Sequence, residues 1–346
     1  MTAIDAPNTT VQDHRRAASI SALLAGYLLT AAYGVILVDR LCAAPQTLGL
    51  FGLSLHLGRL HIPALAATRV LLVIPAILTA ELCLVGWRQS SLYRLTAGGD
   101  ASSRTDLAYF VCVHLQAMGR LNELLTLGVA LISGLWLHQA LRNLTGLDLS
   151  IAAWPLAAQV GVFALIYSFC DYWSHRLDHT ALFWPLHRYH HAATEFCVIN
   201  SARVHPAIFT AVLINAAPIA LIAVSPEAVI DAGLYFTALR FLIHSRLDAD
   251  FGWLGRWLIQ SPRRHRLHHI RDMSQPIAHY SLAPIWDRLF GTWREDPDHV
   301  VEIGVATPYR HGTWIGPDLW RDYCEFWRGI AAPAVRLLRR RRAGLA

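Results

Sequence analysis

The chain has no lysine, few charged residues and no closely spaced cysteine pair. Its net charge of +6 comes from arginine, and only 16% of its 346 residues are charged, whereas 54% are hydrophobic. Soluble domains carry about 25% charged residues, so this composition indicates an integral membrane protein. Because the arginines lie near apolar segments, we expect anionic lipid head groups as their partners and predict no nucleic-acid binding.

The six cysteines include no C-x2-C pair, which argues against disulfides and against a zinc–thiolate site. The sequence also has no H-E-x-x-H motif of a zinc protease, no glycine-rich dinucleotide-binding motif and no haem-binding domain. The N-terminal residues do not have the pattern of a cleaved signal peptide. We therefore expect the first apolar segment to remain as a membrane anchor.

Long apolar segments predict an all-α, multi-pass transmembrane helical bundle, because about 20 apolar residues cross the hydrocarbon core. Residues 107–118 are predicted to form a partial or interfacial helix, and the polar residues 88–106 a loop. The division predicted is an N-terminal transmembrane region of about three spans (1–150), a histidine-rich domain (151–300) and a cytosolic basic tail (301–346). The predicted crossings are 17–38, 62–87, 121–141, 151–173, 207–224 and 228–244.

Arginines concentrate before the first span, after the second and fourth spans, and beyond the last pair of spans. The positive-inside rule places these segments in the cytosol. The same topology puts every histidine cluster on the cytosolic side, as a helical cap. We therefore predict a bacterial inner-membrane protein whose active site faces the cytosol.

Eight of the eighteen histidines form three clusters, with spacings H-x3-H, H-x2-HH and H-x2-HH. On a helix, positions i, i+3 and i+4 lie on one face, so each cluster is predicted to point its imidazoles at a single spot. Imidazoles are costly to bury without partners, which disfavours a purely structural role for the whole set. The clusters are His175 and His179; His187, His190 and His191; His265, His268 and His269.

This ligand set indicates two metal ions with open coordination positions. Structural zinc takes four ligands and closes its shell, so eight histidines are too many for one such ion. Imidazole suits zinc, copper, iron and nickel, and the clusters contain no thiolate. Iron is favoured over two catalytic zincs because a site at a membrane face meets acyl or sterol chains, and attack on their C–H bonds requires redox chemistry.

The sequence resembles the fatty acid hydroxylase and sterol desaturase superfamily of membrane di-iron oxygenases. The resemblance covers residues 171–293 and rests on DYWSHRLDH, FWPLHRYHH, RVHP, PRRHRLHH and WDRLFGTW. It implies that the eight clustered histidines bind two iron ions, which activate O2 with electrons from a separate ferredoxin, cytochrome or reductase. It implies a hydroxylated or desaturated lipid as product, and hydroxylation is favoured because most bacterial-looking members are treated as hydroxylases.

The resemblance also implies further residues of the site. His244 stands where the family often has another ligand and is included in the predicted set, whereas Asp248 is an open alternative. His279 is a candidate ligand or ligand-supporting residue, and His205, in RVHP, is expected to be structural or to support a ligand. The carboxylates expected to orient ligand histidines are Asp171, Asp178, Glu195 and Asp287.

Two other classes of function compete with the oxygenase. A metal transporter would distribute its polar ligands across the bilayer, whereas these clusters lie beyond the ends of the predicted spans. A lipid sensor with a structural metal would be favoured by missing ligands, but all three clusters are intact. The identity of the lipid stays open among sterols, hopanoids, carotenoids, acyl chains and aminolipids.

Overall fold

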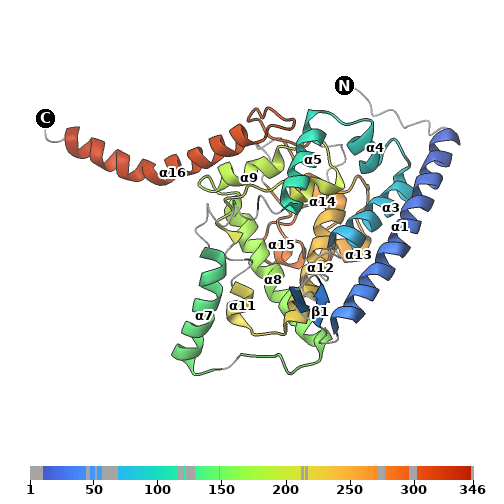
Figure 1. The fold of residues 1–346 in the computed structure, drawn as a ribbon. Coiled ribbons are helices and arrows are strands. Elements are labelled where there is room, and N and C mark those ends of the chain that lie inside the picture. The colour runs from blue at the N-terminus through green and yellow to red at the C-terminus, as the bar shows by residue number, and fades with distance from the viewer. Residues whose placement is uncertain are drawn as a thin grey trace.

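In the computed structural model, helices pack side by side around a central helix and carry most of the described chain (Figure 1). The structure describes residues 11–43, 47–50, 53–56, 69–115, 118, 121, 129–147, 149–211, 214, 217–271, 277–295 and 302–343. A short antiparallel hairpin pairs Thr47 with His56 and Leu50 with Leu53, a departure from the all-α prediction. Apart from it, the described elements are helical, which confirms the predicted helical character.

The N-terminal half contains one long helix, the hairpin and several shorter helices. In chain order these are α1 (Val11–Ala43), β1 (Thr47–Leu50), β2 (Leu53–His56), the π-helical turn η2 (Arg69–Val73), α3 (Ile74–Val85), α4 (Ser91–Thr96), α5 (Ala101–His114) and α7 (Val129–Thr145).

The C-terminal half contains the histidine clusters. Its elements are α8 (Leu156–Asp178), α9 (Trp184–His191), the 3-10 turn η3 (Val198–Ala202), α11 (Ala217–Leu221), α12 (Pro226–Ile243), α13 (Gly252–Trp257), α14 (Pro262–His268), α15 (Ile285–Leu289) and α16 (Gly316–Ala343).

Within the described part of the chain, two helices are long and apolar enough to cross a membrane: the segment Asp13–Leu37 of α1, and α8. The best apolar window of α1 is 0% buried by the rest of the protein, and side chains such as Leu23 and Leu29 are 75% exposed. Such a surface is unfavourable in water and is expected for a helix that contacts lipid.

The other predicted crossings have weaker support. Within 62–87 the structure shows η2 and α3, of which Leu71–Val85 forms a shorter apolar helix. Helix α12 covers most of the predicted crossing 228–244, and α7 overlaps the second half of the predicted crossing 121–141. Residues 62–68, 122–128, 212–213 and 215–216 lie outside the described residues, so those parts of the predicted spans are not described.

The predicted polar loop 88–106 is wrong in part, because two helices begin within it. The Ser90 hydroxyl accepts from the Tyr93 backbone N–H at 3.2 Å and begins α4. The Asp100 carboxylate accepts from the Ser103 backbone N–H at 2.8 Å and begins α5. Serine and aspartate were interpreted as loop residues here, but they act as helix N-caps that bind the first free N–H groups.

The connection 225–227 between the predicted crossings 207–224 and 228–244 is also shorter than expected. Ser225 is the N-cap of α12, with its hydroxyl accepting from the Ala228 N–H at 3.3 Å, and Pro226 and Glu227 already belong to the helix. Proline is favoured in the first turn because its missing N–H is not needed there. Residues 207–210 are not helical, so the described helix before this turn is only α11.

Helix α8 is the centre of the packing and brings the chain to the histidine-rich region. The aromatic ring of Tyr167 stacks on Phe236 of α12 at 4.5 Å, and Ala164 packs against the same hydrophobic cluster. At the other end of α8, Gln159 donates to the carbonyls of Ala152 and Trp154 and accepts from the Ser225 N–H. These contacts fix α8 and α12 side by side.

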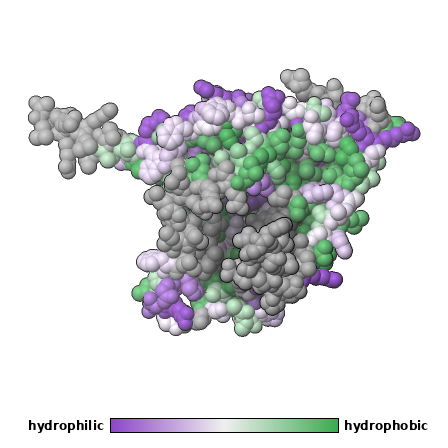
Figure 2. Space-filling view, viewed as in Figure 1, coloured by the Kyte–Doolittle hydropathy of each residue, from purple (hydrophilic) through white to green (hydrophobic). Residues whose placement is uncertain are grey.

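Buried Glu81 ties three separate segments together. Its carboxylate accepts from the Ser91 N–H at 2.6 Å, from the Ser91 hydroxyl at 2.8 Å and from the Arg246 N–H at 2.6 Å. The acidic residue that interrupts the second apolar segment therefore faces the protein interior. Figure 2 shows hydrophilic side chains along the upper edge of this face and hydrophobic side chains gathered beneath them.

Candidate metal centre

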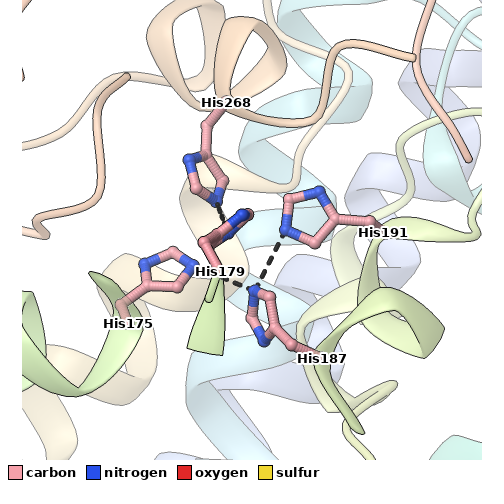
Figure 3. Close-up of side chains that lie close together, drawn as sticks. All are labelled: His175, His179, His187, His191 and His268. Carbon is pink, nitrogen blue, oxygen red and sulfur yellow. Dashed lines mark hydrogen bonds between the residues drawn. The ribbon is translucent and has the colours of Figure 1, made fainter. Parts of the chain in front are cut away.

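All nine predicted ligand histidines lie together in two neighbouring groups. Within each group, the nitrogens available for a metal lie within 4.8 Å of one another. The five-histidine group contains His175, His179, His187, His191 and His268, whose rings converge from three directions (Figure 3). The four-histidine group contains His190, His244, His265 and His269.

The prediction that each cluster points at a single spot is wrong for both H-x2-HH boxes. His187 and His191 of α9 enter the five-histidine group, whereas His190 enters the other. An α-helix turns about 100° per residue, so i+3 and i+4 lie on opposite sides of residue i. Residues i and i+4 share one group and i+3 faces the next. The box at α14 is divided in the same way: His265 and His269 belong to the four-histidine group, and His268 belongs to the five-histidine group.

The Nε2 atoms within each group face one another at nearly constant separation. His187 Nε2 lies 3.1 Å from His175 Nε2 and 3.0 Å from His191 Nε2. His179 Nε2 lies 3.1 Å from His268 Nε2. In the four-histidine group the corresponding Nε2 separations are 3.3 Å for His190 and His244, 3.0 Å for His244 and His265, and 3.1 Å for His265 and His269.

Backbone carbonyls hold several of these rings from the opposite side. His268 Nδ1 lies 2.8 Å from the Ala278 carbonyl, and His175 Nδ1 lies 2.6 Å from the Tyr280 carbonyl. In the other group, His190 Nδ1 lies 3.2 Å from the Arg203 carbonyl and His244 Nδ1 lies 2.7 Å from the Arg240 carbonyl. A carbonyl can only accept, so each of these Nδ1 atoms carries the proton.

The positions of these protons indicate whether a cation fits between the rings. In the pair His190 and His244, each neutral ring uses its one proton at Nδ1, so the two Nε2 lone pairs face each other at 3.3 Å. No hydrogen bond can join two acceptors. Two nitrogens that lie about 2.1 Å from one ion and about 90° apart are about 3.0 Å from each other. The residues therefore fit a metal ion, which removes the repulsion.

Burial keeps the imidazoles of α9 and α14 neutral. It lowers the pKa of His187, His190 and His191 well below the usual range, and neighbouring imidazoles lower each pKa further. The same causes lower the pKa of the three histidines at α14. Metal ligation requires the unprotonated nitrogen, so no proton has to leave these rings at neutral pH before an ion binds.

Only part of the predicted carboxylate set approaches the ligand histidines. Asp178 Oδ2 lies 3.8 Å from His187 Nδ1, while Asp178 Oδ1 accepts from the Thr210 hydroxyl at 2.6 Å. Asp171 instead pairs with the Arg240 side chain at 2.6 Å. The Arg240 carbonyl in turn binds His244, so Asp171 is linked to that ligand through Arg240. Glu195 binds Arg246 at 2.7 Å, away from both groups.

The open candidates His205, Asp248 and His279 lie outside both groups. His205 is buried, and its Nε2 binds the Leu319 carbonyl at 2.9 Å while its Nδ1 accepts from the Ala207 N–H. Asp248 is exposed and pairs with Arg263 at 2.9 Å. These partners give His205 and Asp248 structural and surface roles, respectively.

His279 turns its ring away from the ligands, although its neighbours touch them. The ring packs edge-on against Trp293 at 4.9 Å, and the residue has a φ of 59°. Positive φ is uncommon for a residue with a side chain. It directs the flanking carbonyls of Ala278 and Tyr280 to two ligand rings while the His279 side chain points elsewhere.

Sequence reasoning missed the role of this segment as a backbone support. Asp287 Oδ1 accepts from the Tyr280 N–H and Asp287 Oδ2 from the Ser281 N–H, each at 2.9 Å. The sequence predicts that Asp287 orients a ligand histidine directly, but its carboxylate binds the backbone instead. The motif WDRLFGTW singled out the residue, whereas the carbonyls that it positions have no sequence signature.

Two buried arginines hold the helix that supplies three ligands. Arg188, between His187 and His190, donates to Asp322 of α16 at 2.7 Å and also binds Glu325. Arg203 pairs with buried Asp106 of α5 at 3.0 Å, and its own carbonyl binds His190. Buried charges require such partners. The arginines of HRYHH and RVHP therefore fix α9 against α16 and α5.

The fold and site together define a helical protein with two helices of membrane length and a buried, all-histidine candidate metal centre. Residues 160–292 match the fatty acid hydroxylase family model. The matched segment is similar to that family, and it contains all nine histidines of the two groups. The family resemblance drawn from the histidine boxes is thus confirmed.

Curated relatives of this chain include lipid-modifying oxidoreductases. The chain is 30% identical over 158 residues to ornithine lipid hydroxylase OlsE of Rhizobium tropici, covering 44% of this chain and 47% of that protein. It is 31% identical over 162 residues to alkylglycerol monooxygenase of Danio rerio, covering 44% of this chain and 36% of the relative. The human alkylglycerol monooxygenase is 29% identical over 140 residues, covering 40% of this chain and 31% of the relative. No solved structure gives a significant match.

The chain thus spans less than half the length of each of these relatives.

Proposed function

We propose that this protein is a membrane-bound di-iron, O2-dependent hydroxylase that acts on a C–H bond of a lipid. The observation that carries the proposal is the pair of histidine groups, whose Nε2 atoms face one another without a proton between His190 and His244. The nine imidazoles of these groups would hold the two irons. Fatty acyl, sterol-like and aminolipid molecules are the substrate classes to test.

Iron is proposed over other imidazole-binding metals because the named relatives are a hydroxylase and monooxygenases. When bound, iron would supply the O2 activation that an unreactive C–H bond requires. The same names favour hydroxylation over desaturation, which keeps desaturation as the second candidate reaction. A metal-binding lipid sensor and a metal transporter are weaker candidates, because neither accounts for relatives that oxidise lipids.

The chain's own residues prepare the site for this chemistry. Burial keeps the imidazoles neutral, and the carbonyls of Ala278, Tyr280, Arg203 and Arg240 direct four Nε2 atoms inward. The ring of Tyr280 lies 5.2 Å from His179 and 5.5 Å from His268, so an aromatic wall covers one side of the five-histidine group. In the proposed reaction this ring would help to keep water from the reacting carbon.

We further propose that α1 and α8 cross a bacterial inner membrane within a multi-pass bundle, with the histidine domain on the cytosolic side. The apolar, uncovered surface of α1 and the membrane length of α8 support this placement. In this arrangement residues 1–150 anchor the chain, 151–300 form the catalytic domain and 301–346 form a basic tail. A ferredoxin, cytochrome or reductase docking from the cytosol would deliver electrons.

Metal analysis tests the proposed centre. Protein produced in iron-supplemented cells and purified in detergent is expected to contain about two irons per chain, and His268→Ala and His190→Ala are each expected to lose iron, because they remove one ligand from different groups. The buried histidine variant His205→Gln is the matched control and should retain iron. Stoichiometric zinc without iron, under reducing conditions, would contradict the oxygenase and favour the sensor.

Lipid analysis then tests the reaction. Lipid extracts from cells that express the wild-type chain are compared by mass spectrometry with extracts from cells that express His190→Ala. Hydroxylation predicts a lipid that gains one oxygen atom, derived from labelled O2 gas. Loss of two hydrogen atoms without added oxygen would instead establish desaturation, and identical lipid profiles in a host with a suitable electron donor would argue against both.

A further inference from the structure

Two short helices near the metal centre carry an apolar surface that the described protein does not cover. Helices α13 and α15 contact one another, and the Arg288 Nε of α15 donates to the Arg256 carbonyl of α13 at 2.7 Å. A soluble protein rarely exposes so many large apolar side chains together. The exposed fractions are 64% for Trp253, 46% for Leu254, 39% for Trp257, 45% for Leu258, 38% for Ile285 and 67% for Leu289.

This surface lies beside α8 rather than beyond its end. Trp286 Nε1 donates to the Ser168 hydroxyl at 3.0 Å, and the Phe290 ring stacks on Tyr172 at 5.2 Å. At 1.5 Å of rise per residue, Ser168 and Tyr172 lie about 15 Å and about 9 Å along the helix before Asp178, the last residue of α8. In Figure 1, α13 and α15 accordingly lie level with the middle of α8 and below α9.

Charged residues limit how deeply the surface can enter an apolar phase. Arg256 is exposed at its edge, and the Arg288 guanidinium lies over the rings of Trp257 at 4.4 Å and Trp293 at 4.0 Å. An arginine at the bilayer centre is costly, whereas arginine and tryptophan are both favoured at the membrane interface. The composition therefore fits the boundary between head groups and acyl chains.

We propose that α13 and α15 form an interfacial lip that inserts beside α8 into the head-group and upper acyl region of the bilayer. This inference rests on the proposed membrane location of α8, with which the apolar surface is continuous. It modifies the predicted topology, in which the chain beyond the last crossing forms a cap outside the membrane. The occupant of the surface is lipid, rather than a second protein.

The lip places lipid next to the five-histidine group. The Tyr172 ring, which stacks on Phe290 directly after α15, lies 6.2 Å from the Tyr280 ring. The Tyr280 ring lies 5.8 Å from His175 and 5.5 Å from His268. A continuous run of aromatic rings thus joins the seam between α8 and α15 to the metal ligands, so the proposed lipid contact lies on the side of the five-histidine group that these rings cover.

Depth-dependent fluorescence quenching tests the lip in the full-length, iron-loaded protein. Single cysteines are labelled with an environment-sensitive fluorophore after the accessible native cysteines are replaced by serine. The labelled variants are Leu254→Cys and Leu289→Cys in the lip, Leu165→Cys on α8 and Glu302→Cys as an exposed control. Nanodiscs of phosphatidylcholine and phosphatidylglycerol carry nitroxides on the acyl chains, and iodide is the aqueous quencher.

The expected result is that lipid nitroxide quenches positions 254, 289 and 165 several-fold more strongly than position 302, whereas iodide shows the opposite order. If position 165 contacts lipid but 254 and 289 are quenched by iodide, the lip is refuted and the membrane location of α8 stands. If iodide quenches 165 as well, both proposals fail. Shielding of 254 and 289 from both quenchers would show that protein covers the surface and would also refute the lip.

Discussion

Asp287 offers the sharpest test of how the fold orients the metal ligands, because it touches none of them. Its side chain is buried and accepts the Tyr280 and Ser281 N–H groups at 2.9 Å and the Thr292 hydroxyl at 2.7 Å. The Tyr280 carbonyl in turn binds His175 at 2.6 Å. The carboxylate therefore shapes the backbone segment that holds one side of the five-histidine group.

In Asp287→Asn, one carboxylate oxygen becomes an NH2 group, so one of the three donors faces another donor. A hydrogen bond to a charged acceptor contributes about 1.5–3 kcal/mol, and we expect the free energy of unfolding to fall by about that amount. Loss of a residue that supports a metal ligand typically lowers metal affinity or activity about 10–100-fold. We expect a loss of iron affinity in this range.

The assay is competition for iron with a chelator of known affinity, followed by elemental analysis and by denaturant unfolding of the same preparations. Asp248→Asn is the matched control, because Asp248 is also an aspartate of the same domain but is exposed and pairs only at the surface with Arg263. An exposed pair contributes at most about 1 kcal/mol. The control should keep wild-type iron affinity.

Wild-type iron affinity and stability in Asp287→Asn would refute the reasoning that the backbone segment 278–281 is held by this carboxylate. An equal loss of iron in both aspartate variants would also refute it, because the effect would then not depend on the buried contacts.

Three further predictions follow from buried charges and imidazoles. Because burial lowers the pKa of the α9 and α14 histidines, the unfolded chain binds more protons below about pH 6.5. The free energy of unfolding of the metal-free protein should therefore fall, as the pH falls below about 6.5, by up to about 1.4 kcal/mol per pH unit for each histidine. A free energy of unfolding that does not change with pH in denaturant titrations would contradict this. Asp106→Ala leaves the buried Arg203 charge without its carboxylate partner and should lower the free energy of unfolding by about 3–5 kcal/mol. Part of this free energy should be recovered in the double variant with Arg203→Met. Arg188→Met removes the contacts to Asp322 and Glu325, so limited proteolysis should release α16 faster than in the wild type.

The histidine boxes predicted eight of the nine histidines that lie together in the two groups, and the family resemblance added His244. Their spacing repeats the helical period, and imidazole has few roles other than metal binding when it occurs in such number. The backbone contacts could not be predicted in the same way. Every residue type has a backbone carbonyl, so the amino-acid sequence does not identify Ala278 or Tyr280 as residues whose carbonyls bind ligand histidines.

Secondary structure was predicted well where hydrophobic segments were long and poorly where caps decided the outcome. The segments around α1 and α8 were found because their apolar runs match the membrane thickness. The starts of α4 and α5 were missed because serine and aspartate favour loops and helix N-caps alike. Only the observed hydrogen bonds of Ser90 and Asp100 distinguish the two.

The sequence by itself determined the composition of the site: nine imidazole side chains and no thiolates, within a chain too apolar for an ordinary soluble domain. Tertiary structure decided how they divide, because a helix turns residues i+3 and i+4 to opposite sides of residue i. Each H-x2-HH box therefore contributes to both groups. The separation into two groups depends on where α8, α9, α12 and α14 meet, and long-range packing sets that arrangement.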